Sequence, residues 1–411
     1  MSRLEIDVCG VKLKNPLVVA SATPTKNAEF FRRSFESGAA AAVAKTVIPD
    51  EMGGQPMRTY VRPRFTILNR KAYPHSFTHY SSEFACEYRP DEWMNELRQA
   101  KKHAEEHDAR LIGSMGAISL ENWRNLARAH EDAGCDMLEA WMFACPNLSG
   151  SSISSSGGLS LAFDQWVDMI GTAVQSVRIP IFVKVGSEFG IHSILGGAHA
   201  AKKGGAAGVT VGDRTSALEV DLKTGRPLLA GGFSGCGGPW MRPIVQKFVV
   251  RVAQEVGLPI AFSGGIWTWE DVVKVLMVGS TTVQVCTAIM YSKKGYGIIR
   301  DLVGGLDRYL AKNGYASVND LRGISLPQLR TFDTLERTPK GEIYVDVIRD
   351  LCDGCGYCSH WCYYDAITFG TDRIAIVDKE KCDGCGLCLA LCPQDAFEMQ
   401  GSVPVYMGLE S

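Results

Sequence analysis

Short apolar runs recur along the first three hundred residues, and longer amphipathic or alanine- and glycine-rich stretches separate them. Runs of this length are typical of buried strands in a parallel sheet. We predict strands at 17–21, 40–45, 110–115, 136–140, 181–185, 208–211, 259–263 and 282–286. The stretches 121–134 and 163–177 are examples of the helices between them. Eight strands alternating with helices predict an α/β fold, the (β/α)8 TIM barrel, over about 250 residues.

A short segment, IDVCGVKLKNP, precedes the first of these strands. We expect it to form a hairpin that closes the bottom of the barrel. An open doubly wound sheet also fits the alternation, but no G-x-G-x-x-G follows the first strand. The pattern therefore favours a barrel over 1–300, followed by a helical connection over 301–342.

The composition changes near residue 343, because eight of the fourteen cysteines lie in the last sixty residues. They form two copies of C-x2-C-x2-C-x3-C, CDGCGYCSHWC and CDGCGLCLALC, in an internal repeat of thirty residues. In this arrangement the fourth cysteine of each run binds the cluster of the other run. One [4Fe–4S] cluster is thus assigned to Cys352, Cys355, Cys358 and Cys392, and the other to Cys382, Cys385, Cys388 and Cys362.

Structural zinc is the alternative for this tail, but zinc sites normally use two separated C-x2-C pairs rather than quartets. The tail over 343–411 resembles a small α+β bacterial-type 2[4Fe-4S] ferredoxin. It departs from the usual pattern at Tyr363, which follows Cys362 where a proline is usual. This difference concerns the local backbone and the reduction potential, and leaves the cluster ligands unchanged.

Charge and hydropathy restrict the partners and the cellular location that we expect for the protein. The formal net charge of -2 provides no basic surface for nucleic acid and no polybasic anchor for lipid, so we expect neither partner. The first ten residues carry charges where a signal peptide is apolar, and no window has 18 uninterrupted apolar residues. We therefore expect a cytoplasmic protein, in which cysteines bind metal rather than form disulfides.

Two clusters relay single electrons, so a barrel fused to them needs a cofactor that converts this supply into two-electron chemistry, as a flavin does. Glycine-rich loops suited to a flavin phosphate follow the predicted strands: AGGFSG after the sixth, SGGI after the seventh and CTAIM after the eighth. Lys45 and Lys184 end the second and fifth strands, where their charges would stabilise a reduced flavin. Ordinary turn glycines and solvent-exposed lysines are the alternatives.

With these features the chain resembles the flavin-plus-ferredoxin part of the dihydropyrimidine dehydrogenases, in the dihydroorotate dehydrogenase family. The matching motifs are NPLVVASATPT, AKT, the Leu68-Asn69 pair, the Cys145-Pro146 pair, FVK, GGFSG, SGGI and QVCTA. The resemblance implies that FMN is bound around Ala20, Ser21, Lys45, Thr46, Lys184, Gly232, Gly235, Gly264, Gly265, Cys286 and Thr287. It also implies that Asn69 faces the substrate.

The serine-rich stretch NLSGSSISSSGGLSLAF looks like a linker, but in this family the segment after Cys-Pro is the mobile loop that carries the catalytic acid or base. The resemblance places Ser160 where dihydropyrimidine dehydrogenases have a cysteine, which makes Ser160 and Lys184 the candidate catalytic residues. Ser154, Ser155 and Ser156 are rival positions for the acid or base. A helix cap near Ala162 is the structural alternative for Ser160.

Three departures from the family concern the substrate. Met142 lies near the place of a missing asparagine, and Asp213-Arg214 replaces the Asn-Thr of the sixth strand. These changes leave the amides of a uracil-like ring unpaired, at about 1–3 kcal/mol for each group. Asp213 and Arg214 either pair with each other or contact the substrate. A free Arg214 would favour a substrate that carries a carboxylate.

The resemblance implies an iron–sulfur flavoprotein oxidoreductase that transfers hydride between FMN and an activated C=C of a small cyclic substrate, not necessarily a pyrimidine. Because the sequence lacks a second dinucleotide-binding unit, we expect electrons from an NAD(P)H-oxidising flavoprotein subunit or a free ferredoxin, and a homo- or hetero-oligomer. One alternative is a true dihydropyrimidine dehydrogenase subunit acting on uracil and thymine. Another is a non-catalytic electron-transfer subunit of a larger redox complex.

Overall fold

The computed structural model describes residues 2–50, 64–68, 77–83, 85–142, 163–186, 191–229, 232–329 and 342–401. The predicted sites Asn69, Ser154, Ser155, Ser156 and Ser160 lie outside these ranges. The chain divides into two compact units, Met1–Leu329 and Arg330–Ser411, and each is described by itself. None of the helices in the described ranges is long and apolar enough to cross a bilayer.

Among the described residues of the first unit, eight parallel strands close into a barrel in the order β10-β13-β14-β3-β4-β7-β8-β9. Their bounds are β3 (Leu17–Val19), β4 (Ala41–Val43), β7 (Arg110–Met115), β8 (Met137–Trp141), β9 (Ile181–Val185), β10 (Gly208–Val211), β13 (Ile260–Ser263) and β14 (Thr282–Val285). Val283 of β14 lies opposite Leu17 of β3, and this pairing brings the last strand back to the first. The predicted TIM barrel and its eight strands are confirmed.

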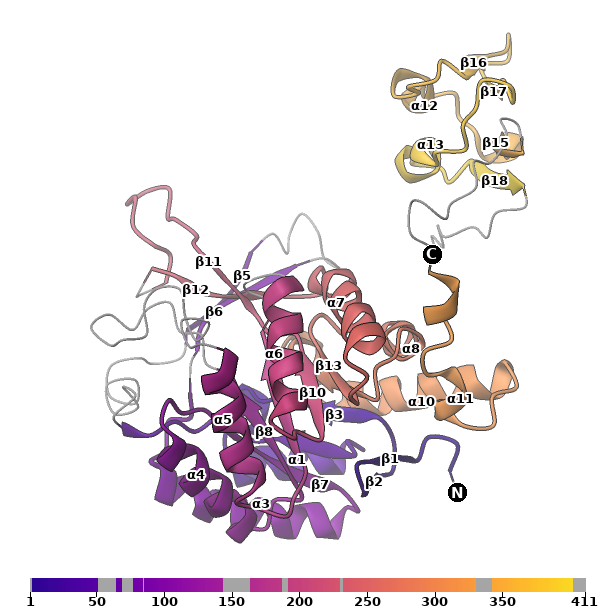
Figure 1. The fold of residues 1–411 in the computed structure, drawn as a ribbon. Helices are drawn as coiled ribbons and strands as arrows, with labels where there is room; N and C mark the ends of the chain where they lie inside the picture. The colour runs from indigo at the N-terminus through magenta and orange to yellow at the C-terminus, as the bar shows by residue number, and fades with distance from the viewer. Residues whose placement is uncertain are drawn as a thin grey trace. The chain divides into compact units, whose positions relative to one another are not determined.

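Helices surround the strands of the barrel (Figure 1). They are α1 (Ala28–Glu36), α3 (Pro90–Glu106), α4 (Leu120–Asp132), α5 (Phe163–Val174), α6 (Ile191–Lys203), α7 (Met241–Glu255), α8 (Trp269–Met277), α9 (Thr287–Tyr291), α10 (Ile298–Lys312) and α11 (Val318–Leu321). Several begin at a side-chain cap, as where Ser119 accepts a hydrogen bond from the Asn122 N–H at the start of α4. Each buries one apolar stripe, for example Phe31 and Phe35 of α1.

The segment before the barrel forms the expected hairpin from β1 (Ile6–Val8) and β2 (Val11–Leu13). Val8 and Leu13 line a small cavity together with residues at the amino ends of barrel strands, among them Met137, Phe182 and Thr282. The hairpin therefore closes the bottom of the barrel, as predicted, and leaves the opposite end for a ligand.

A four-stranded antiparallel sheet that the sequence did not predict joins four segments in the order β11-β12-β6-β5. Its strands are β5 (Arg64–Leu68), β6 (Thr78–Ser82), β11 (Thr215–Ala217) and β12 (Ser234–Gly237), which lie together in Figure 1. Two of them read TSA and SGCG, sequences with low strand propensity. Part of the GGFSG motif is therefore strand rather than a loop.

The first unit continues past the barrel strands, because α10 packs against α8 and buries Ile299, Leu302, Leu306 and Leu310. Its short 3-10 helices are η1 (Thr23–Thr25), η4 (Gly295–Gly297) and η5 (Leu326–Gln328).

The second unit is small and mixed. Its strands β15 (Ile343–Val347) and β18 (Phe397–Gly401) pair antiparallel, as do β16 (Ile367–Phe369) and β17 (Ala375–Val377). Two short helices, α12 (Tyr357–His360) and α13 (Leu387–Leu391), and the 3-10 helix η7 (Arg349–Leu351) complete it. This is the α+β arrangement that the cysteine repeat predicts for the tail.

Candidate functional site

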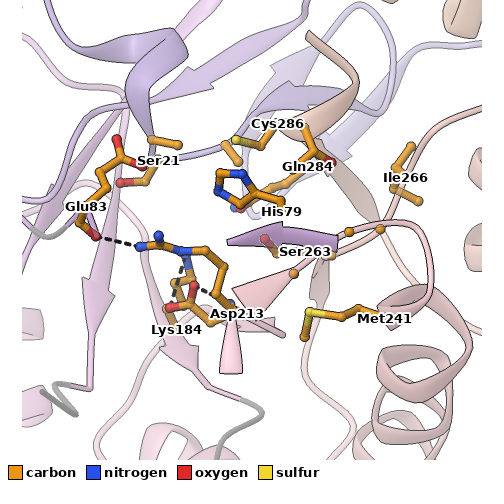
Figure 2. A pocket seen from close by; sticks show the side chains of 18 residues that line it. Ser21, His79, Glu83, Lys184, Asp213, Met241, Ser263, Ile266, Gln284 and Cys286 are labelled. Atoms are coloured by element: carbon orange, nitrogen blue, oxygen red, sulfur yellow. Dashed lines mark hydrogen bonds and ion pairs between the residues drawn. The ribbon is translucent and has the colours of Figure 1, made fainter. Parts of the chain in front are cut away.

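An open cavity of about 630 Å³ lies where the barrel strands end. Figure 2 shows side chains from several strand ends directed into it. Its walls are formed by Ala20, Ser21, Ala22, His79, Glu83, Lys184, Asp213, Arg214, Gly237, Gly238, Met241, Ser263, Gly264, Gly265, Ile266, Gln284, Cys286 and Thr287. The carboxyl end is the face where TIM barrels place their active sites.

One wall of the cavity is backbone without side chains. Gly264 and Gly265 follow β13 with φ of 142° and 76°. A Cβ on Gly265 would lie 2.6 Å from the Arg242 nitrogen and 2.8 Å from the Gly238 oxygen, so a larger residue cannot be accommodated. Helix α7 begins beside them at Met241, and the positive end of the helix dipole favours an anion. This wall therefore fits a phosphate group.

The centre of the barrel holds a buried polar cluster around Glu139. Its carboxylate accepts hydrogen bonds from the Thr210 hydroxyl at 2.8 Å and from the Gln284 Nε2 at 2.6 Å. Because a carboxylate only accepts, this contact fixes the orientation of the Gln284 amide. The Gln284 Oε1 is then left buried with no partner among the described residues. An orphaned acceptor beside a cavity fits a ligand that brings an N–H group.

Lys184 lies between two carboxylates of this cluster. Its Nζ is 3.8 Å from Glu139 Oε1 and 3.7 Å from Asp213 Oδ2. Burial would lower the pKa of the Lys184 ammonium, but Asp213 and Glu139 outweigh it and raise the pKa. The neighbouring carboxylates therefore favour the charged form of Lys184, which lines the cavity at the end of β9.

Lys45 is also buried at the end of its strand, where its Nζ lies 2.7 Å from Glu83 Oε1. The Thr23 hydroxyl donates to the same carboxylate. Burial alone would raise the pKa of Glu83, but Lys45 and Arg214 outweigh it and lower the pKa to about 2. Glu83 lines the cavity wall, and Lys45, which is paired with it, is not among the lining residues.

The Asp213-Arg214 pair lies in the cavity with its two side chains directed to different groups. Asp213 approaches Lys184, while the Arg214 guanidinium donates to the Ser81 hydroxyl at 2.5 Å and to the Glu83 backbone oxygen at 2.7 Å. Figure 2 shows Asp213 beside Lys184 in the cavity. The Asp213 and Arg214 side chains therefore each have polar partners of their own, besides any contact with each other.

The structure brings most of the predicted site residues together. Those that line the cavity are Ala20, Ser21, Lys184, Asp213, Arg214, Gly264, Gly265, Cys286 and Thr287. Thr46 contacts this group through its hydroxyl, 3.1 Å from that of Ser21. Gly235 lies on β12 against Arg214, while Gly232 and Met142 are not among the lining residues.

Several lining residues were not predicted from the sequence, above all His79 and Glu83. They belong to β6 and the residue after it, and no motif marks that segment. Gly237 and Gly238 form part of the wall in place of the predicted Gly232. The sequence could have indicated these two glycines, because they form a Gly-Gly pair shortly before helix α7.

The second unit has a cavity of its own, of about 380 Å³. The four cysteines assigned to one cluster, Cys362, Cys382, Cys385 and Cys388, all line it, together with Cys358. In the described part of the chain, no group of three or more His, Cys, Asp or Glu side chains is placed to hold a metal ion. In a [4Fe–4S] cluster four thiolates hold one cluster between them, so cysteines that surround a cavity fit such a group.

The two cysteine runs have matching local structure. Gly354 and Gly384 have φ of 72° and 63°, and Gly356 and Gly386 have φ of 85° and 75°. The Ala366 and Ala396 N–H groups donate to Cys362 Sγ at 3.4 Å and to Cys392 Sγ at 3.3 Å. These features of one run therefore have counterparts thirty residues later, which is the internal symmetry expected of a two-cluster domain.

Comparison with known families agrees with both units. A family model described as dihydroorotate dehydrogenase matches residues 3–310, and one described as a 4Fe-4S dicluster domain matches residues 341–399.

Individual relatives cover most of the chain. The NAD-dependent dihydropyrimidine dehydrogenase subunit PreA of Escherichia coli is 31% identical over 370 residues, which are 88% of this chain and 85% of that protein. The catalytic subunit of dihydroorotate dehydrogenase B (NAD(+)) of Thermoplasma acidophilum is 26% identical over 326 residues, 79% of this chain and 100% of that protein. Its counterpart in Pyrococcus furiosus is 28% identical over 324 residues, 78% and 98% of the two chains.

Proposed function

Since the chain belongs to the dihydroorotate dehydrogenase family, we propose that it is the FMN-binding, iron–sulfur subunit of an oxidoreductase that acts on an activated C=C bond of a small cyclic substrate. The family fixes the reaction class as oxidation and reduction at CH–CH bonds. The observation that carries the finer proposal is the pair of cavities, one at the barrel mouth and one lined by five cysteines, in a single chain.

The residues of the barrel mouth fit FMN. Gly264, Gly265 and the start of α7 would hold its phosphate, with Cys286 and Thr287 from the neighbouring strand end. The Gln284 Oε1 provides an acceptor for an N–H of the flavin ring, and Lys184 provides the positive charge. When bound, the flavin supplies hydride chemistry, and the two clusters supply it with single electrons.

The reaction also needs a proton at the carbon beside the one that exchanges hydride. Lys184 is held charged by Asp213 and Glu139, and its role is to stabilise negative charge. We assign the proton exchange to Ser160, on the resemblance described above, with Ser154, Ser155 and Ser156 as rivals. A serine is a weaker acid than a cysteine, so this assignment includes a bound water or a second polar group as its partner.

Electrons reach the clusters from outside the chain in this proposal. The relatives from E. coli and T. acidophilum are named as subunits of NAD-dependent enzymes. A partner subunit that oxidises NAD(P)H fits those names, and a free ferredoxin is the alternative donor. The purified chain should then be reduced by dithionite but not at a useful rate by NADH.

The identity of the E. coli relative supports a second candidate, a dihydropyrimidine dehydrogenase acting on uracil or thymine. The polar groups of the cavity favour a different substrate, because Asp213 and Arg214 are charged and a uracil ring is neutral.

The experiment that tests the proposal is anaerobic purification of the full chain, followed by analysis of its cofactors. We expect one FMN and about eight irons per chain, with acid-labile sulfide in equal amount. Direct reduction with NADH and with dithionite then tests the electron route. Zinc in place of iron would overturn the assignment of the clusters. Absence of flavin would overturn the FMN site, and rapid reduction by NADH alone would overturn the external electron donor.

A further inference from the structure

The Arg214 guanidinium is the cavity cation with the least charge compensation from the groups it bonds to. Lys45 contacts the Glu83 carboxylate, and Lys184 lies near those of Glu139 and Asp213. Arg214 instead makes its two side-chain hydrogen bonds within the described residues to neutral oxygen atoms, the Ser81 hydroxyl and the Glu83 carbonyl. Two of its five N–H groups are used there, which leaves three for a ligand.

Gly235 of β12 makes room for this guanidinium. A Cβ at that position would lie 2.8 Å from Arg214 Nη1, 2.9 Å from Cζ and 3.0 Å from Nε. Cβ atoms do not approach other heavy atoms this closely, so a residue larger than glycine would displace the guanidinium. The strand therefore provides a flat backbone surface against which the planar guanidinium lies.

A chain of hydrogen bonds through Ser81 and His79 holds the Arg214 guanidinium in place. Ser81 Oγ is 3.0 Å from His79 Nε2, and His79 Nδ1 is 2.8 Å from the Tyr291 hydroxyl. Arginine only donates, so the Ser81 hydroxyl accepts from it and is free to donate to His79 Nε2. Nδ1 then carries the proton and donates to Tyr291. Burial and the nearby Arg214 lower the pKa of His79 to about 4, which is consistent with the neutral ring that this order requires.

We propose that Arg214 binds a carboxylate of the substrate, and that Ser81 and His79 are positioning residues for its guanidinium. Planar guanidinium and carboxylate groups match in two hydrogen bonds, and this half-buried guanidinium, whose own hydrogen bonds go to neutral oxygens, has N–H groups left for an incoming anion. The flavin phosphate is a poor candidate for this role, because Gly264, Gly265 and α7 form a separate anion site. The proposal rests on the proposed function and names its substrate class.

The test compares substrates that share a ring and differ in one group. Orotate and its carboxamide form one such pair, with uracil as the unsubstituted ring, and 1-cyclohexene-1-carboxylate with its carboxamide forms a second. Each is mixed anaerobically with the dithionite-reduced full chain, loaded with FMN and both clusters, and flavin reoxidation gives kcat/KM for the substrate half-reaction. Binding to the oxidised chain is followed in parallel through the flavin absorbance.

For the wild type we expect the carboxylate of at least one pair to be preferred over its carboxamide by about 10²-fold or more. Arg214→Gln should remove this preference, because kcat/KM for the acid should fall by about 10²-fold and by much more than kcat/KM for the carboxamide. Ser81→Ala should raise KM for the acid while kcat stays close to wild type, and Arg214→Lys should restore part of the preference. FMN content and circular dichroism establish that each variant is folded.

Different outcomes overturn different parts. If neither acid is preferred over its carboxamide while some ring compound still reoxidises the flavin, the role of Arg214 is overturned and the proposed function stays intact. An Arg214→Gln variant that keeps the acid preference but shifts the flavin absorbance or potential assigns the guanidinium to the flavin. A fully loaded chain that no ring reoxidises overturns both proposals.

Discussion

Lys45 Nζ and Glu83 Oε1 form an ion pair of 2.7 Å inside the barrel mouth, with both side chains less than a tenth exposed. Lys45 comes from the end of β4, whereas Glu83 follows β6 of the antiparallel sheet. The pair therefore ties the sheet to the barrel and sets the charge of the cavity wall at the same time.

Glu83→Gln should destabilise the first unit, because it leaves the buried Lys45 charge without its counter-ion. We expect the free energy of unfolding to fall by about 3 kcal/mol or more. Glu29→Gln is the matched control, since Glu29 pairs with Arg32 and Arg33 on the exposed face of α1 and its loss should leave the free energy of unfolding almost unchanged. Seven of the eight tryptophans precede residue 330, so tryptophan fluorescence in a denaturant titration follows this unit. Equal small losses in both variants would show that the pair contributes nothing.

The pH dependence of stability should report His79. Its pKa is lowered to about 4 by burial and by Arg214, so the folded ring stays neutral while an unfolded one binds a proton near pH 6.5. Stability is then fully present above about pH 6.5 and falls as the pH drops toward 4, by up to about 3 kcal/mol. His130, fully buried, also has its pKa lowered to about 4 and acts in the same direction.

Replacing His79 with glutamine isolates its share, because His130 remains. We expect the wild type to bind about two protons on unfolding through these residues at pH 5, and His79→Gln to bind about one fewer. Denaturant titrations between pH 7 and 5 give the slope. Identical slopes in the two proteins would mean that His79 is already charged in the folded state.

Gly265→Ala should abolish FMN binding, because the added methyl meets the backbone of Arg242 and Gly238 and the residue has φ of 76°. Gly225→Ala is the control for backbone strain alone, since Gly225 has φ of 66° and nothing within 4 Å of the added Cβ. The control should lose about 1 kcal/mol of stability and keep its flavin. Flavin released by heat from each purified variant measures the difference, and full FMN content in Gly265→Ala would exclude this loop as the phosphate site.

Cys362→Ala should remove one cluster and leave the other. The side chain lines the cavity of the second unit with Cys382, Cys385 and Cys388, and we assign it as the ligand that the first run contributes to their cluster. Iron should fall from about eight to about four per chain, with FMN unchanged. Cys236→Ala, on β12 of the first unit, is the control and should keep all of its iron. Loss of iron in neither variant would contradict the crossed assignment of ligands.

The barrel was predictable because its signal is local. Each strand is a short, continuous apolar run, and the carboxyl ends of such strands must meet at one face. This rule alone places Ser21, Lys184 and Gly264 together, as they are found in the cavity wall. The cysteine spacing is local in the same sense, since each run carries three of the four cysteines assigned to one cluster.

His79 and Glu83 could not be found in this way. Their position depends on β6 pairing with β12, with Tyr80 opposite Cys236, a contact between segments far apart in the sequence. The strand propensities of these short segments do not predict that pairing. The role of Gly235 shows the same limit, because the motif that contains it suggests a phosphate loop, whereas the structure places it against Arg214.

The central claim is that this chain moves electrons from its clusters through a flavin at the barrel mouth to a C=C bond. Stopped-flow mixing of the anaerobic, dithionite-reduced full chain with cyclic unsaturated acids and amides tests it without any partner protein. We predict that at least one of these compounds reoxidises the flavin and the clusters and is recovered with its double bond saturated. A chain that contains FMN and about eight irons, yet remains reduced in the presence of every compound, would contradict the account.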